Sequence, residues 1–278
     1  MSVVINTNIP SISASRALYS TRQDLEQAME RLSSGKRING AKDDAAGMSV
    51  VTRMKAQITS LGQAVRNAND GISMLSTYDG AADEIEDILI RMRELGTLAQ
   101  NDTYTDDDRA NANLEYAALA AEIDRIAGKT KFNGTLDIAT TAADITYSFQ
   151  VGFNGGDAVA VAFKKLNTTA LQGSAVNANG IKTVDLAASA VAEADAGLSN
   201  LNVARATIGA AINRLEHTVN NLMNVIQRTE ESRSRIEDAD FAAESAALAR
   251  ANVLTQAGSA MLAQANQSPQ YVLSLLRS

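Results

Sequence analysis

Few residue types in this sequence could carry out catalysis. There is one histidine, His217, and no cysteine, which excludes a two-histidine metal site, a cysteine-based zinc site and a cysteine nucleophile. His217 lies between Leu215 and Val219, on the flank of a hydrophobic stripe, and the sequence singles out no nucleophile near it. We therefore interpret His217 as a surface or interface residue.

Two other stretches imitate binding motifs. Gly128-Lys129-Thr130 resembles the end of a phosphate-binding loop, but Ile123 occupies the position of that motif's upstream glycine. The acidic residues 101–108 lack the alternating ligands and central glycine of an EF-hand, and predict a turn that caps the next helix. We expect no catalytic residue, no cofactor and no metal site, and thus a protein that is not an enzyme.

Composition narrows the class of protein further. Acids outnumber bases by 32 to 25 and are interspersed with them, which disfavours nucleic-acid binding. Aromatic residues make up only 4%, so the apolar side chains are mostly small or aliphatic and suit close helix–helix seams. The start lacks the pattern of a secretory signal and no apolar run reaches membrane-spanning length, so we expect no cleaved signal peptide and no membrane partner.

Long helices with coiled-coil spacing must position any functional residues of this chain. Apolar residues recur at intervals of three and four from Val51 to Ala99, which predicts a helix about 70 Å long. A second stripe runs from Ala187 to Thr229, with Arg205 as its only charged member, and the stretch from Ala112 to Ile126 predicts a helix that packs back on the first. Helices of this length are typical of structural proteins.

Both chain ends carry shorter stripes. The N-terminal helix is predicted to stop at Gly35, and Asp43 and Asp44 are candidate N-caps for the long helix that follows. At the other end, Pro269 is predicted to end the helical pattern. Neither terminal helix should be stable alone, so we expect partners, most simply a second copy of the chain. The candidate self-assembly seams include Leu18, Leu25, Leu32, Leu254, Met261 and Ala265.

A short β-like segment separates the two long stripes. Alternating apolar residues on either side of a turn at residues 154–157 predict a β-hairpin at about 146–163, and residues 164–183 are predicted to be loop. Its candidate packing residues are Tyr147, Phe149, Val151, Phe153, Val159, Val161 and Phe163.

Several ordered motifs at the two ends closely resemble bacterial flagellin. They read INTN at residues 5–8, RLSSGKRINGAKDDAAGM at 31–48, RSRIEDADF at 233–241 and QAGSAMLAQANQSPQYVLSLLR at 256–277. The resemblance implies a mainly α fold, a long antiparallel helical coiled-coil bundle with a small β-hairpin and paired N- and C-terminal helices. It implies an inner domain of residues 1–43 with 236–278, a bundle domain of residues 44–235, and no large outer domain.

The resemblance also implies a function and partners. Flagellins self-assemble into the extracellular flagellar filament after export through the flagellar type III apparatus, without a cleaved signal peptide. Their partners are further copies of themselves, the filament cap, junction proteins and an export chaperone that binds the C-terminal helix. The hairpin from Tyr147 to Phe163 would take part in switching between subunit packings, with the candidate switch residues Phe149, Val151, Phe153, Val159 and Val161. Matching positions for Toll-like receptor 5 are Arg91, Leu95 and Glu115.

Two alternatives have no need of a long polymer. A hook–filament junction protein shares the terminal coiled-coil design but caps the hook. A soluble coiled-coil adaptor or secretion chaperone would bind a client and should not need both terminal stripes.

Overall fold

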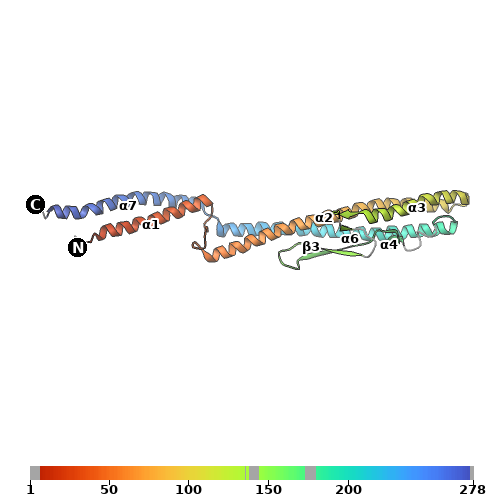
Figure 1. The fold of residues 1–278 in the computed structure, drawn as a ribbon, viewed down its shortest axis with the longest axis horizontal. Helices are drawn as coiled ribbons and strands as arrows, with labels where there is room; N and C mark the ends of the chain where they lie inside the picture. Colours follow the sequence, from red (N-terminus) through yellow and green to blue (C-terminus); the bar gives the residue numbers. More distant parts are fainter. Residues whose placement is uncertain (1–6, 135, 138–143, 173–179, 276–278) are drawn as a thin grey trace. The chain divides into compact units, whose positions relative to one another are not determined.

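A computed structural model describes residues 7–134, 136–137, 144–172 and 180–275 (Figure 1). The chain divides into two compact units, residues 1–58 with 227–278 and residues 59–226. The predicted division, 1–43 with 236–278 and 44–235, has the same nested order, and its boundaries stay a prediction for the domains of an assembled subunit. The predicted fold class, mainly α with long packed helices and a small antiparallel strand pair, is confirmed.

In the first unit, α1 (Ile9–Ser34) lies beside α7 (Phe241–Leu275), with the start of α1 next to the last turns of α7 (Figure 1). The Asn8 side chain caps α1 by accepting a hydrogen bond from the Ser11 N–H at 3.1 Å. The helix stops at Gly35, whose φ of 70° is left-handed and whose N–H donates to the Arg31 carbonyl. This confirms the predicted stop.

The two aspartates proposed as N-caps have different roles. Asp44 accepts a hydrogen bond from the Gly47 N–H at 2.8 Å and so caps α2 (Ala45–Ala99). Asp43 accepts from the N–H groups of Asn39 and Gly40, which closes the turn before the helix and holds the pKa of Asp43 below its usual value. Only the Asp44 prediction is therefore confirmed.

The second unit is built on α2, α3 (Asp106–Lys129) and α6 (Val184–Glu237). Their coiled-coil stripes form the core, as predicted, because the spacing keeps one apolar seam of each helix turned inward. A capping box between Thr105 and Asp108 starts α3, and the buried Arg109 donates to the Ala99 carbonyl at the end of α2. The fully buried residues include Leu75, Tyr78, Ile85, Leu89, Met92, Ile123, Leu201 and Leu215.

Two antiparallel strand pairs follow α3. The first joins β1 (Lys131–Phe132) to β2 (Leu136–Asp137). The second joins β3 (Ile145–Gln150) to β4 (Ala158–Phe163), with Ile145 opposite Phe163 and Gln150 opposite Ala158, which confirms the predicted hairpin. Phe153 lies beyond β3 in the connecting turn and is 49% exposed, so the alternation does not extend to it.

Two expectations about the connections are wrong. Residues 164–183, predicted to be loop, contain α4 (Thr168–Gln172), which is held on α3 by hydrogen bonds from the Thr168 N–H and hydroxyl to Asp124. Leu166 and Leu171 are buried there, so a short apolar segment without periodicity packs by tertiary contact. Pro269 does not end the last helix either, because α7 continues to Leu275.

Arg205, the charged member of the second stripe, meets three carboxylates. Its guanidinium pairs with Asp79 at 3.0 Å, Asp83 at 3.1 Å and Glu86 across the seam between α6 and α2. These carboxylates lie at i, i+4 and i+7, on one face of α2, so they can surround a single cation. The ionic cluster thus favours one register of α2 against α6. An apolar residue at position 205 would pack almost equally well in several registers.

We expect Arg205→Met to destabilise the second unit by about 1–2 kcal/mol, because it leaves three carboxylates facing one another beside a half-buried seam. Urea unfolding of the monomer, followed by circular dichroism, measures the loss. Arg214→Met is the matched control, since Arg214 is an exposed arginine on the same helix. Equal stabilities for the two variants would refute a structural role for the cluster.

Candidate assembly surface

The pair formed by α1 and α7, here called the terminal pair, is held by a narrow seam of small and aliphatic side chains. The α1 side of this seam is the predicted stripe, half-buried at Leu18, Leu25 and Leu32 and fully buried at Ala28. On α7 the shielded positions also follow 3,4 spacing, and they are Glu244, Leu248, Ala251, Thr255, Gly258, Leu262 and Ala265.

The predicted stripe on α7 is divided between two surfaces. Ala251, Gly258 and Ala265 face the seam, whereas Leu254 is 49% exposed and Met261 is 64% exposed. The division follows from size, since small residues let α1 approach the α7 backbone closely; a Cβ built at Gly258 would lie 3.2 Å from the Leu18 side chain. Leu254 and Met261 are left on the outside of the terminal pair.

An apolar groove runs between α1 and α7, and its lining combines seam residues with the outer residues Leu254 and Met261. Its volume is about 480 Å³, and Leu254 and Met261 form part of its wall. The other lining residues are Pro10, Ser13, Ala14, Ala17, Leu18, Thr21, Ala257, Gly258 and Ala265. No side chain in this set carries a charge, so the groove offers contact area for an apolar surface.

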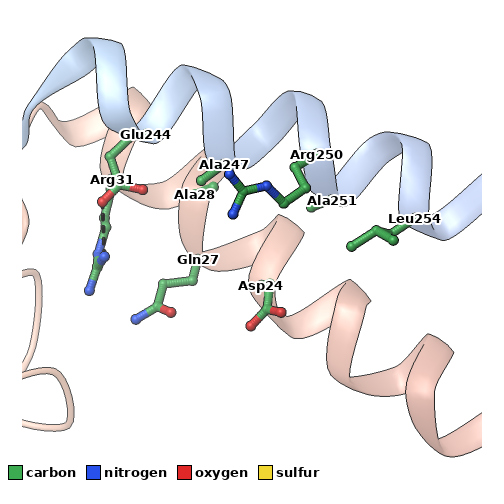
Figure 2. A pocket seen from close by; sticks show the side chains of 9 residues that line it. All are labelled: Asp24, Gln27, Ala28, Arg31, Glu244, Ala247, Arg250, Ala251 and Leu254. Carbon is green, nitrogen blue, oxygen red and sulfur yellow. Dashed lines mark hydrogen bonds and ion pairs between the residues drawn. The ribbon is translucent and has the colours of Figure 1, made fainter.

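A second, polar hollow of about 240 Å³ lies further along the terminal pair (Figure 2). Arg31 of α1 donates to Glu244 of α7 at 2.9 Å, and both side chains are largely shielded. Figure 2 shows Asp24 on the α1 wall and Arg250 on the α7 wall. The terminal pair therefore changes from polar to apolar along its length.

The exposed surface of the terminal pair is unusually apolar for a monomer. Large hydrophobic side chains between 49% and 66% exposed occur on both helices, namely Ile9, Ile12, Tyr19, Met29, Phe241, Val253, Leu254 and Met261. Monomeric proteins rarely expose so many on one element pair, so this region is a candidate surface for contact with other protein.

A buried carboxylate, that of Glu237 at the end of α6, joins this helix to α2 and to the segment before α2 within the first unit. Glu237 is only 4% exposed, and it accepts hydrogen bonds from Lys55 at 2.7 Å and Lys36 at 3.0 Å. Burial alone would raise the pKa of Glu237, but the hydrogen bonds from Lys55 and Lys36 outweigh it and lower the pKa below its usual value. The Glu237 backbone also accepts from the Arg37 N–H at 2.7 Å.

Sequence reasoning did not identify Glu237 as a functional residue. The available signal was the RSRIEDADF motif, which served above only as one of the motifs that carry the flagellin resemblance. Its partners Lys36 and Lys55 lie about 200 and 180 residues earlier in the chain, so only the fold brings them together.

The hairpin, the candidate switch element, packs on α2. Val151, Val159 and Val161 are buried, and Phe149 lies over Gly71, where an added Cβ would come within 3.0 Å of its ring. Asn67 of α2 donates to the Gln150 carbonyl at 3.1 Å. Any movement of the hairpin therefore has to break contacts with α2.

A tyrosine fixes the far end of the hairpin. Burial, with the nearby Asp144 charge, raises the pKa of Tyr78, so its hydroxyl stays protonated and donates to the Lys164 carbonyl at 2.7 Å. The Tyr78 ring also meets Phe163 edge to face, with centroids 5.4 Å apart.

The three candidate receptor residues are close together but differ in exposure. Arg91 pairs with Glu115 at 2.8 Å and with Glu94 at 3.0 Å, and these side chains are about half exposed. Leu95 is only 4% exposed, because it belongs to the α2 core stripe. Arg91 and Glu115 thus offer a surface, whereas Leu95 supports it from below.

The residues considered for catalysis are dispersed. His217 is exposed on α6, well apart in the chain from the Gly128 turn at the end of α3. Within the described residues no group of three or more histidine, cysteine, aspartate or glutamate side chains is arranged to hold a metal ion. None of the described helices has the length and apolarity needed to cross a bilayer.

Comparison with known proteins matches both ends of the chain to one family. The profile of the bacterial flagellin N-terminal helical region matches residues 5–137, and that of the bacterial flagellin C-terminal helical region matches residues 191–276.

Full-length relatives agree with these profiles. The chain is 43% identical over 275 residues to the flagellin of Halalkalibacterium halodurans, covering 99% of this chain and 100% of the relative. It is 36% identical to Listeria monocytogenes flagellin, covering 99% of each. It is also 37% identical to the flagellar filament 33 kDa core protein of Treponema phagedenis, covering 99% of this chain and 100% of the relative.

Among solved structures, the crystal structure of Bacillus cereus flagellin is 35% identical to this chain. The match covers 56% of this chain and 88% of that one, with a TM-score of 0.48.

Proposed function

Because this chain belongs to the bacterial flagellin family and is a structural subunit of the flagellar filament, we propose that it polymerises through the terminal pair. The observation that carries the proposal is the exposed apolar groove bordered by Leu254 and Met261. Covering it with a neighbouring subunit removes apolar surface from water, which is the main driving force of protein association.

Seeded assembly tests this proposal. The purified protein is dissociated by heat or acid, short filament seeds are added at neutral pH, and products are viewed by negative-stain electron microscopy. Variants lacking residues 1–34 or residues 241–278 are examined in parallel. We expect long helical filaments from the intact chain alone, and filaments from either truncated variant would contradict the proposal.

The family also suggests the route and partners of the subunit. We expect export into the extracellular flagellum without a cleaved signal peptide, assembly under a filament cap, contact with junction proteins, and a chaperone on α7 before export. An apolar α7 surface supports such a chaperone, since that surface needs cover until assembly. A role in catalysis is not part of this proposal, because the family's role is structural.

The alternative functions are not favoured. Relatives named flagellin match this chain over almost their whole length, so a hook–filament junction protein or a soluble adaptor has less support.

Locking the hairpin onto α2 should restrict the filament to one helical shape. A Cβ built at position 71 lies 3.1 Å from the Cγ of Phe149, the position that a cysteine sulfur would occupy at residue 149. The double variant G71C/F149C is therefore within reach of a disulfide. We expect oxidised filaments to keep one shape when pH or salt is changed, as seen by dark-field microscopy. The same filaments after reduction are the control, and unchanged switching in the oxidised form would refute a role for the hairpin.

We expect the monomer to activate Toll-like receptor 5, and Arg91→Ala to reduce activation at least about tenfold. Arg91 and Glu115 form an exposed charged pair that a receptor can reach. A reporter-cell assay measures activation. Arg93→Ala is the matched control, because Arg93 is an equally exposed arginine on α2 that pairs with Asp195 instead. An inactive wild-type monomer would refute the prediction.

Leu95→Ala is not a clean test of receptor contact. Since Leu95 is buried, its truncation leaves a cavity that costs about 2–5 kcal/mol of stability. The test therefore depends on Arg91.

A further inference from the structure

Pro269 leaves one carbonyl of α7 without its helical partner. In an α-helix each carbonyl accepts a hydrogen bond from the N–H four residues later, and proline has no N–H. The carbonyl affected by Pro269 is that of Ala265, and α7 nevertheless continues to Leu275. A freed carbonyl on a half-shielded face is a strong acceptor that needs another donor.

Asn8 supplies that donor. Its side-chain amide donates from Nδ2 to the Ala265 carbonyl at 2.9 Å. The amide oxygen of the same side chain accepts from the Ser11 N–H at 3.1 Å and caps α1. Asn8 therefore uses one end of its amide to start α1 and the other end to reach α7, 257 residues along the chain.

The apolar contacts of the seam specify register weakly, and polar contacts between α1 and α7, such as the Arg31–Glu244 pair and the Ser11–Asn266 hydrogen bond, add to them. Small residues such as Ala251, Gly258 and Ala265 recur every seven residues on α7 and offer α1 nearly equivalent positions one or two turns apart. Only one carbonyl in this part of α7 is freed by proline, since Pro269 is the only proline in the helix. A polar contact with a unique acceptor can select one position among several apolar ones.

We propose that Asn8 and Pro269 act together as a register lock for the terminal pair. Pro269 exposes the Ala265 carbonyl, Asn8 binds it, and α1 is thereby held at one longitudinal position along α7. Asn8 is a positioning residue, which acts through the seam and need not contact a neighbouring subunit. The role of this lock in assembly rests on the proposed function, while the pairing of α1 with α7 can be measured separately.

Introduced cysteines report the register directly, because the chain has none of its own. The variant L18C/G258C reports the observed register, since a Cβ at position 258 would lie 3.8 Å from the Leu18 Cβ, a distance suited to a disulfide. The variant L18C/L262C reports a shift of about one helical turn. The ratio of the two disulfide yields measures how firmly the register is held.

Each reporter is combined with Asn8→Asp, which keeps an oxygen to cap α1 and removes the Nδ2 donor. We expect this change to lower the ratio of observed-register to shifted-register disulfide about fivefold, the size of one net hydrogen bond. In a Pro269→Ala background the Ala265 carbonyl regains a helical N–H, so Asn8→Asp should then change the ratio little. Ser13→Ala is the control, because the Ser13 hydroxyl donates to the Pro10 carbonyl within α1 at 2.9 Å and makes that bond without α7.

Two results would overturn the lock. One is an unchanged ratio in the Asn8→Asp variant, and the other is an equally large effect with and without Pro269. The yields are measured both in free monomers and in seeded filaments. Failure of the parent chain to form filaments would count against the proposed function, whereas the disulfide ratio in the monomers would still decide the register lock.

Discussion

Replacing Leu254 and Met261 together with glutamate is expected to raise the concentration needed for filament growth more than about 100-fold. Leu254 is 49% exposed and Met261 is 64% exposed, so both retain much apolar area that a neighbouring subunit can bury. Burying one such side chain contributes about 1.5–3 kcal/mol, and every 1.4 kcal/mol is about a factor of ten in affinity. A buried unpaired carboxylate adds a further penalty.

Sedimentation of seeded reactions over a range of protein concentrations measures this change. Gln256→Glu is the matched control, because it adds a negative charge to an exposed position on the opposite face of α7. Circular dichroism of the monomers should be unaltered, since neither Leu254 nor Met261 forms part of the shielded α7 seam. Normal filament growth by the double variant would show that the groove is not an assembly contact.

Replacing Glu237 with glutamine is expected to destabilise the first unit by about 2 kcal/mol at neutral pH. The carboxylate is almost fully shielded, and its two lysine partners are 42–45% exposed, which reduces the cost of leaving them unpaired. Glutamine keeps the shape of the side chain, so the loss reports the charge. Chemical unfolding followed by circular dichroism measures it.

The same variant should change the pH dependence of stability. Because the folded-state pKa of Glu237 is lowered, its contribution is fully present above the ordinary glutamate pKa of 4.5 and is lost as the pH falls through the lower folded value. We expect the difference between wild type and Glu237→Gln to shrink as the pH falls below about 4.5. A difference that stays constant across that range would contradict the assignment.

Glu231→Gln is the control for both measurements. Glu231 lies on the same helix and pairs with Arg228 at 3.3 Å, but the Arg228 side chain is 79% exposed, so the pair is well solvated. We expect its loss to cost less than about 0.5 kcal/mol.

The long helices and the hairpin could be predicted because their causes are local. A 3,4 spacing of apolar residues over 49 positions from Val51 to Ala99 admits one helix, and alternation around residues 154–157 admits one hairpin. The stop at Gly35 is equally local, since a left-handed residue after the last turn favours glycine.

Errors arose where a local rule was overruled by contacts distant in the chain. Pro269 removes a hydrogen bond from α7, yet the Asn8 side chain satisfies the freed carbonyl and the helix continues. The loop expected at residues 164–183 contains α4 because Asp124 of α3 binds Thr168, a pairing that no periodicity reveals.

The sequence by itself determined the family, the helical class, the positions of the long helices and the apolar character of both ends, because each depends on neighbouring residues or on ordered motifs. Only the tertiary structure decided which face of α7 meets α1 and which stays free. An alanine-rich helix has adjacent apolar stripes of similar strength, so the choice depends on how closely the partner backbone can approach. The same holds for Glu237, since a carboxylate is shielded and paired only once folding brings Lys36 and Lys55 to it.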